Sequence, residues 1–309
     1  MKKIPQVLFL ATNDYANAGS LYSKALNSVG IQSTVVIEKG HKFGFPNQGT
    51  IVCDPKKRQK MIDNTDIVVF LHSVFTPGNY KDKRLFVFHG GSRYRRRQVS
   101  INKLFNPIIE KSIIQTAEML GKGAKNEVWL LPPVDTLLIK PDYSMINPSM
   151  LMFAHFPNKP ECKGSAIINP IINQIMDDKK YTRKIGYKYN KKRVIWDKNI
   201  IRIKNSCDVY IEQIGFMGNW SITALEAAAL GKIVITNFES SALYKQEYGE
   251  HKILVANTTT KLKDIIQQLL DLDQDRIIEL KKETRKWVEE YHSFEAVGKR
   301  MKEHVFGIK

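Results

Sequence analysis

Short apolar segments recur along the first half of the chain, separated by turns or helical stretches. The segments predicted as strands are Val7–Ala11, Thr34–Ile37, Asp66–His72, Leu85–His89 and Val128–Leu131. Segment 66–72 is almost wholly apolar, which is typical of a strand in a parallel sheet covered on both faces. Ser20–Val29 is a predicted helix that ends at Gly30. Strands that alternate with such connections predict a doubly wound parallel sheet.

The second half repeats this alternation after Pro141, Asn147 and Pro148 interrupt the pattern. Its predicted strands are Leu151–Ala154, Ile185–Tyr189, Asp208–Glu212, Lys232–Thr236 and Lys252–Ala256. Predicted helices cover 166–176, 260–272 and 274–291, and one more ends near Leu230. We therefore expect an α/β protein with two Rossmann-like, doubly wound parallel-sheet domains. The two domains are predicted to face a cleft, where ligands meet the carboxyl ends of the strands.

The length of 309 residues agrees with two domains of roughly 150 residues each. The predicted domains are 1–145 and 146–292. Residues 293–309 are predicted as a last amphipathic helix, which we expect to pack back toward the first domain.

The composition, 43% hydrophobic and 26% charged, is that of an ordinary globular protein. Cys53, Cys162 and Cys207 have no paired spacing, which argues against a disulfide scaffold or a zinc site and fits a reducing compartment. No segment approaches the roughly 20 apolar residues of a membrane span. The apolar run near the start is predicted as a strand rather than a secretory leader. We expect a cytoplasmic protein, with peripheral contact at the inner face of a membrane as a further hypothesis.

The net charge of +17 is unevenly distributed. Residues 51–100 hold 11 Lys or Arg against 4 Asp or Glu, and residues 179–204 hold 11 against one. Such an excess attracts an anionic partner, which is a nucleic acid, a phospholipid surface or an acidic substrate. A solubilising basic face explains the same composition without any partner.

Segment Cys207–Thr236 carries the most informative pattern in the chain. It is predicted as a strand, a loop containing Gly218, an Ala-rich helix capped by Asn219 or Ser221, and a second strand. Free backbone N–H groups and the helix dipole make such a helix start an anion site. Glu226 lies further into the helix, about 7.5 Å along its axis, so a phosphate at the start would leave Glu226 near a ribose diol. A strand–helix–strand unit with a glycine loop is also common in α/β proteins where it binds no ligand and the helix only packs on the sheet.

Three further loops follow predicted strands and point to the same ligand. Gly19 would let the backbone approach a ligand at the start of the first helix. His89 and Arg93 flank two glycines and suit a polar substrate or phosphates. Lys159 and Lys163 precede a helix and form a predicted clamp for a departing diphosphate. The simpler interpretations are a capped helix start, a structural histidine and two exposed lysines.

Motifs for other chemistries are missing from the sequence. The seven histidines show no metal-ligand spacing, and neither a Walker lysine loop nor a Ser nucleophile elbow is present. We therefore expect neither a catalytic metal nor a bound cofactor.

Taken in order along the chain, these motifs resemble those of the large retaining, nucleotide-sugar-dependent group of GT-B fold glycosyltransferases. The helix that contains Glu226 is the most specific part of the resemblance. The matching segments are Asp14–Gly30, His89–Arg93, Leu131–Asp135, Lys163-Gly164, Gly215–Gly218 and Glu226–Lys232.

The resemblance implies transfer of a sugar from a nucleotide-diphosphate-sugar donor, a UDP- or GDP-sugar, with retention at the anomeric carbon and without a catalytic metal. The implied acceptor is a glycan, a lipid-linked group or another anionic molecule. By this likeness Lys163, together with Lys159, holds the diphosphate, and Glu226 binds the ribose.

The likeness also implies that domain 1–145 binds the acceptor and domain 146–292 the nucleotide sugar. It further implies that Gly218 and Asn219 face the donor and that His89 lies near the transferred sugar. Two positions depart from the family pattern. Many members carry an acidic residue eight positions before the helix glutamate, where this chain has Gly218. An Arg is common ahead of the Lys-Gly pair, where the nearest cation here is Lys159, and Lys does not replace a bidentate Arg.

Other functions stay open at this point. The charge and the cluster Arg93–Arg97 allow a nucleic-acid-binding module, but no recognised motif supports it and we expect no specific nucleic-acid partner. An epimerase, an inverting transferase or an inactive relative on the same fold is the remaining alternative.

Overall fold

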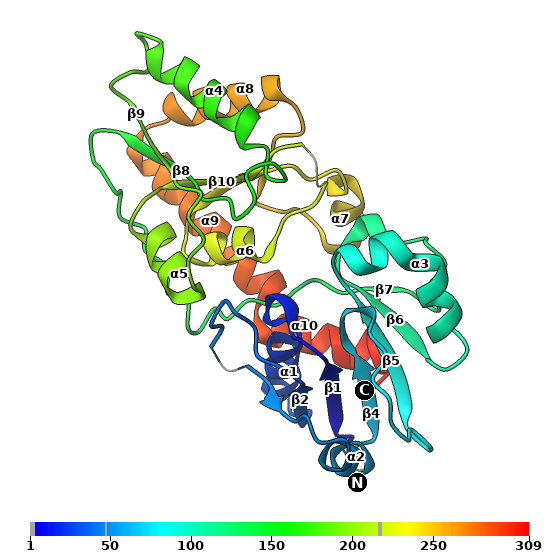
Figure 1. The fold of residues 1–309 in the computed structure, drawn as a ribbon. Coiled ribbons are helices and arrows are strands. Elements are labelled where there is room, and N and C mark those ends of the chain that lie inside the picture. Colours follow the sequence, from blue (N-terminus) through cyan, green and yellow to red (C-terminus); the bar gives the residue numbers. More distant parts are fainter. Residues whose placement is uncertain (1–3, 47, 216–217, 309) are drawn as a thin grey trace. The chain divides into compact units, whose positions relative to one another are not determined.

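The computed structural model describes residues 4–46, 48–215 and 218–308. It divides into two compact units (Figure 1). Unit 1 comprises Met1–Asp135 and His292–Lys309, and unit 2 comprises Thr136–Tyr291.

Unit 1 is built on a seven-stranded sheet in the order β3-β2-β1-β4-β5-β6-β7, with every pairing parallel. Its strands are β1 Val7–Ala11, β2 Ser33–Ile37, β3 Thr50–Ile51, β4 Ile67–Phe70, β5 Arg84–His89, β6 Lys111–Ile114 and β7 Val128–Trp129. Its helices are α1 Ala18–Ser28, α2 Pro55–Asp63, α3 Ser92–Phe105 and α10 Phe294–Arg300, which a π-helical turn, η4 Met301–Val305, extends. Short 3-10 turns are η1 Tyr15–Asn17, η2 Leu71–Ser73 and η3 Ala117–Met119.

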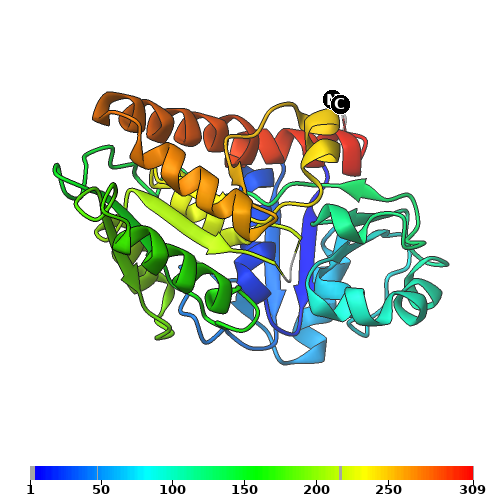
Figure 2. The same cartoon turned by 90° about the horizontal axis from the view of Figure 1, so that it is seen from above.

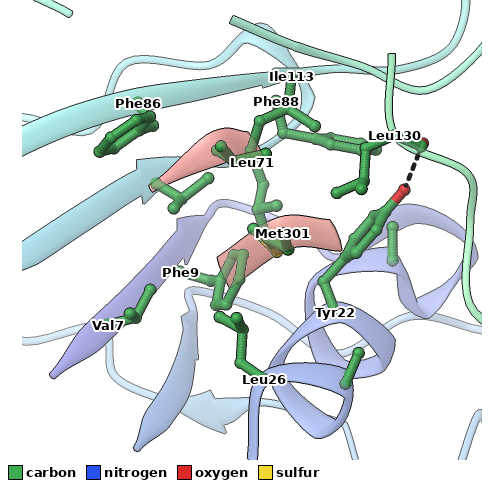
Figure 3. Packing of buried hydrophobic residues seen from close by; sticks show 14 of the residues in the cluster. Val7, Phe9, Tyr22, Leu26, Leu71, Phe86, Phe88, Ile113, Leu130 and Met301 are labelled. Atoms are coloured by element: carbon green, nitrogen blue, oxygen red, sulfur yellow. Dashed lines mark hydrogen bonds between the residues drawn. The ribbon is translucent and has the colours of Figure 1, made fainter. Parts of the chain in front are cut away.

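Both faces of this sheet are covered, which explains the unbroken apolar runs of its central strands. On β1, Val7 and Phe9 belong to a cluster formed with α1 and the C-terminal helix (Figure 3). Leu8 and Leu10 point to the opposite face and pack with α3. Tyr22 of α1 fixes the first cluster further, because its hydroxyl donates to the carbonyl of Leu130 at 3.2 Å.

Unit 2 is built on a five-stranded parallel sheet in the order β12-β11-β10-β8-β9. Its strands are β8 Leu151–His155, β9 Ile185–Tyr189, β10 Val209–Gln213, β11 Ile233–Thr236 and β12 Leu254–Val255. Its helices are α4 Ser165–Asp177, α5 Trp196–Lys204, α6 Ile222–Ala229, α7 Ser241–Tyr248, α8 Thr259–Leu270 and α9 Gln274–His292. Figures 1 and 2 show α4 and α8 side by side, and both contribute to the apolar cluster over this sheet.

The predicted α/β class with parallel sheets is confirmed, whereas α2, α3, α5 and α7 were not predicted. Within the described residues, no helix is long and apolar enough to cross a membrane. The segment after Asp135 belongs to unit 2, so the boundary lies before the predicted position 145. The reason is Arg285 of α9, whose buried guanidinium donates to the carbonyls of Thr136 and Ile139 at 2.7 and 2.8 Å.

Two fully buried lysines lie near the amino-terminal end of β10, and their surroundings differ. Lys281 donates to Asp208 Oδ1 at 3.1 Å and to the carbonyl of Ser144 at 2.7 Å. The Nζ of Lys232 has no hydrogen-bond partner among the described residues. Burial lowers the pKa of Lys232, and the charge of Lys281 lowers it further.

Because their surroundings differ, the two lysines should respond differently to replacement by methionine. Lys281→Met leaves the buried Asp208 carboxylate without its cation and should destabilise the fold by about 3–5 kcal/mol. Lys232→Met replaces an unsatisfied buried amine with an apolar side chain of similar length, so stability should be unchanged or higher. Urea unfolding of the two variants provides the check, and equal losses in both would contradict this account.

Candidate functional site

The carboxylate of Glu212 is the centre of a polar cluster at the carboxyl end of β10. The residue is only 2% exposed, and its oxygens accept hydrogen bonds from Lys163, Ser221 and Thr236. These donors come from the loop after β8, the start of α6 and the end of β11. Parallel strands bring their carboxyl ends to one edge of the sheet, so three separate segments meet there.

Lys163 is held at this carboxylate by its loop. Its Nζ contacts Glu212 Oε1 and donates to Gln213 Oε1 at 2.6 Å. The next residue, Gly164, has φ +70°, and a Cβ there would collide with the carbonyl oxygen of Ile214. Only glycine allows the loop to approach the end of β10 so closely, which explains the Lys-Gly pair.

His155 supports the same loop from inside the fold. Burial lowers its pKa to about 4, so the imidazole is neutral at physiological pH. Nδ1 lies 2.8 Å from the carbonyl of Ile211, which can only accept, so this nitrogen carries the proton. Nε2 then accepts from the hydroxyl of Ser165 at 2.8 Å, which fixes the first residue of α4.

The start of α6 lacks a side-chain cap. Ser221 is the N-cap residue, but its hydroxyl donates to Glu212 Oε1 at 2.8 Å instead of accepting from the helix. Among the described residues, no side chain accepts from the first-turn amides, and those of Ile222 and Thr223 stay available to an anion. Because Lys163 and Ser221 contact the same oxygen of Glu212, the ammonium group lies beside this helix start.

Glu226 lies within α6 and is 6% exposed. Its Oε1 accepts a hydrogen bond from Trp196 Nε1 of α5 at 2.6 Å. Burial raises the pKa of Glu226 to about 7, and the indole hydrogen bond opposes this rise. Its carboxyl group therefore titrates near neutral pH, which is frequent among functional carboxylates.

The remaining predicted residues of unit 2 lie near this cluster. The carbonyl of Asn219 accepts from Gln213 Nε2, so it joins the network of Lys163. Gly218 accepts at its carbonyl from the backbone N–H of Glu239 at 3.0 Å. Lys159 is exposed, and its carbonyl closes the loop by accepting from the N–H of Lys163 at 3.1 Å. Its side chain makes no hydrogen bond or ion pair with another described residue.

His89 and Arg93 lie in unit 1 and meet at Ser73. His89 is 1% exposed, stacks on Tyr94 with ring centroids 4.0 Å apart, and has Nδ1 2.8 Å from the hydroxyl of Ser73. Burial lowers the pKa of His89 to about 3, so the ring is neutral. Arg93 is exposed, and its Nε donates to the carbonyl of Ser73 at 3.1 Å.

The start of α1 differs from the prediction for Gly19. Its backbone N–H already donates to the buried Asp14 carboxylate at 2.8 Å, as does that of Ser20 at 2.9 Å. A Cβ at Gly19 would collide with the side chain of Leu71. The glycine is therefore required by packing inside unit 1, and the anion at this helix start is the protein's own carboxylate, which also lies 3.4 Å from His72 Nε2.

Sequence reasoning missed several members of these clusters, namely Glu212, Gln213, Thr236, Trp196, Asp14, His72 and Ser73. Glu212 carried a usable signal, because an acidic residue directly follows the run Val209–Ile211 within a buried strand. Trp196 carried none, since α5 itself was not predicted. Among the described residues, no group of three His, Cys, Asp or Glu side chains could hold a metal ion.

The sequence matches no protein-family profile and no curated protein. Solved structures share the fold over nearly the whole chain. HepE of Anabaena, solved with UDP and glucose, has a TM-score of 0.64 at 13% identity, covering 98% of this chain and 100% of that one. A glycosyltransferase from Rickettsia africae has a TM-score of 0.59 at 13% identity, covering 98% and 99%.

A third structure with this fold is the N-terminal domain of trehalose-6-phosphate phosphatase from Candida albicans. Its TM-score is 0.64 at 9% identity, covering 99% of this chain and 98% of that one. At such identities the comparisons establish a shared fold, and the residues of each site must carry any argument about activity.

The raised pKa of Glu226 predicts how stability depends on pH. Its folded pKa of about 7 lies above the unfolded value of 4.5. The stability from the protonated form is fully present below pH 4.5 and is lost as pH rises through about 7. Glu226→Gln, which keeps a hydrogen-bond acceptor for Trp196, should remove this dependence and exceed the parent by on the order of 3 kcal/mol at pH 8.

Urea unfolding between pH 5 and pH 8 measures this difference. Glu247→Gln changes an exposed carboxylate on α7 and is the matched control. If the free energy of unfolding depends on pH in the same way for the parent and for Glu226→Gln, burial does not raise the pKa of Glu226.

Proposed function

We propose that this protein is a glycosyltransferase that moves a sugar from a UDP- or GDP-sugar to an acceptor. The observation that carries the proposal is the pair of contacts at Glu212 Oε1, which places the Lys163 ammonium beside the uncapped start of α6. A cation and free helix amides at one point suit a diphosphate. The shared fold with HepE, which was solved with UDP and glucose, and with a glycosyltransferase supports the same reading.

In the proposed site, Lys163 and the first-turn amides of α6 bind the diphosphate. Their positive charge stabilises the diphosphate as its bond to the sugar breaks, so the proposed chemistry uses no catalytic metal. Glu226, further along α6, accepts hydrogen bonds from the ribose hydroxyls. Lys159 adds charge from the exposed side of the loop, while Gly218 and Asn219 line the donor side. Lys163 remains partly exposed, as contact with a ligand requires.

For unit 1 we propose acceptor binding. Arg93 offers an exposed guanidinium group to an anionic acceptor. His89 is buried and neutral, so it contributes through hydrogen bonds rather than through charge. Its Nε2 is buried and has no hydrogen-bond partner among the described residues.

Retention at the anomeric carbon is part of the proposal and rests on the motif resemblance alone. Analysis of the product's anomeric configuration separates a retaining transferase from an inverting one. An epimerase would return a changed sugar nucleotide with no acceptor present.

Removing either donor ligand should reduce turnover. Lys163→Ala and Glu226→Ala are each expected to lower transfer or donor hydrolysis by more than tenfold, because a contact to the leaving group or to the ribose is lost. Lys179→Ala removes an exposed lysine beyond the other end of α4 and should have no effect. Normal turnover in both site variants would contradict the assignment of Lys163 and Glu226 as donor ligands.

Lys163→Ala also leaves the Glu212 carboxylate buried without its cation, which could lower activity through unfolding. The double variant Lys163→Ala with Glu212→Gln removes that unpaired charge. A folded double variant with low activity attributes the loss to the missing cation.

Helix α3 presents an exposed face that is both basic and apolar. Arg96, Arg97 and Lys103 are exposed, with no ion-pair partner among the residues the structure describes. Near them on the same helix, Val99 is 78% exposed and Leu104 is 49% exposed. Cations interleaved with apolar side chains suit the surface of an anionic membrane, and we propose that this face contacts one and gives access to a lipid-linked acceptor.

Each cation near an anionic surface contributes about 1 kcal/mol, so changing Arg96, Arg97 and Lys103 together to Gln should weaken vesicle binding about 100-fold. The measurement is sedimentation with phosphatidylserine-containing vesicles. The matched control changes Lys261, Lys282 and Lys286, which are exposed on α8 and α9. An equal loss in both triple variants would indicate attraction by net charge rather than by α3.

A further inference from the structure

Glu239 occupies the space in which a side chain on residue 218 would begin. A Cβ built on Gly218 would lie 2.5 Å from Glu239 Oε2 and 2.6 Å from Glu239 Cδ. The backbone N–H of Glu239 donates to the carbonyl of Gly218 at 3.0 Å, so the two segments are fixed to each other. A carboxylate from the segment that follows β11 therefore lies beside the backbone of Gly218.

Glu239 directly precedes Ser240, the N-cap residue of α7, where the helix dipole favours an acidic side chain. Glu239 is exposed and makes no side-chain hydrogen bond or ion pair with another described residue. A free carboxylate near the proposed diphosphate site repels the diphosphate.

Backbone and side-chain contacts connect Glu239 to the proposed diphosphate site. Glu239 is bonded to Gly218, and the neighbouring Asn219 accepts from the side chain of Gln213. Gln213 in turn accepts from Lys163 at 2.6 Å. The carboxylate thus lies at the same edge of the sheet as Lys163 but outside the contacts that hold the ammonium.

Resting on the function proposed above, we infer that Glu239 binds the sugar of the nucleotide-sugar donor by accepting hydrogen bonds from its hydroxyls. A carboxylate has two oxygens and accepts from two adjacent hydroxyls, which a hexose supplies and a diphosphate does not. Glu239 therefore selects the intact donor over the free nucleoside diphosphate.

The test compares two ligands in calorimetric titrations of the full chain. The probes are UDP with UDP-glucose and GDP with GDP-mannose, and the pair that binds the parent is carried forward. Glu239→Ala should weaken binding of the sugar nucleotide at least tenfold, because two charge-assisted hydrogen bonds are lost. Binding of the free diphosphate should stay the same or tighten, because a repelling charge is removed.

Glu161→Ala is the control, since it removes an exposed carboxylate from the Lys163 loop and changes the net charge equally. Its effect on the two ligands should be equal. A second variant places the carboxylate at position 218 by combining Glu239→Gly with Gly218→Glu. The space vacated by Glu239 then accepts the new side chain, and part of the affinity for the sugar nucleotide should return.

Opposite effects of Glu239→Ala on the two ligands support the inference. Equal losses for both ligands, or no loss for the sugar nucleotide, overturn it while leaving the diphosphate site intact. If no probe binds the parent chain, the proposed function fails and this inference fails with it.

Discussion

The site of unit 2 depends on one buried charge. A carboxylate that is removed from water needs a cation and hydrogen-bond donors, and Glu212 obtains one ammonium and two hydroxyl groups. Satisfying Glu212 draws Lys163 inward and turns Ser221 away from the helix that it would otherwise cap. The same interaction therefore positions the cation and leaves the start of α6 open to an anion. A change at Glu212 would alter both features together.

Two acidic residues of this site have different surroundings and therefore different roles. Glu212 is surrounded by donors from three segments and organises the protein. Glu226 is buried with one indole N–H as its donor, and burial raises its pKa to about 7. When Glu226 is ionised, it therefore lowers the free energy of unfolding. Such a destabilising residue is retained where it serves a function, and here that function is to accept hydrogen bonds from hydroxyl groups.

Sequence patterns predicted the fold more fully than the site. Strand β4 was readable because apolar, β-branched and aromatic residues mark a strand that is covered on both faces. Helix α2 was missed because charged residues dominate it and few apolar positions mark a buried face. In α3 a cluster of arginines separates the buried apolar positions. Lys163 and Glu226 could be proposed from glycine spacing and helix position. The grouping of Lys163 with Glu212 and Ser221 depends on strand order, which brings distant segments together and leaves no local pattern.

At Gly19 the sequence suggested a ligand position where the structure places groups of the protein itself. A glycine at a helix start predicts room for a ligand, but here Asp14 occupies the amides and Leu71 occupies the space. A local sequence pattern predicts the backbone conformation of a helix start, but it does not predict which group occupies the space beside it. At α6 the corresponding hydroxyl is diverted to Glu212, so two helix starts with similar sequence signals differ in what they can bind.

The central claim is that a diphosphate binds between Lys163 and the first turn of α6. A crystal structure of the protein with UDP or GDP, whichever binds, tests this most directly. The account predicts phosphate oxygens within hydrogen-bond distance of Lys163 Nζ and of the backbone N–H groups of Ile222 and Thr223, with the ribose at Glu226. A nucleotide bound elsewhere, with Lys163 still paired only to Glu212 and Gln213, would contradict it.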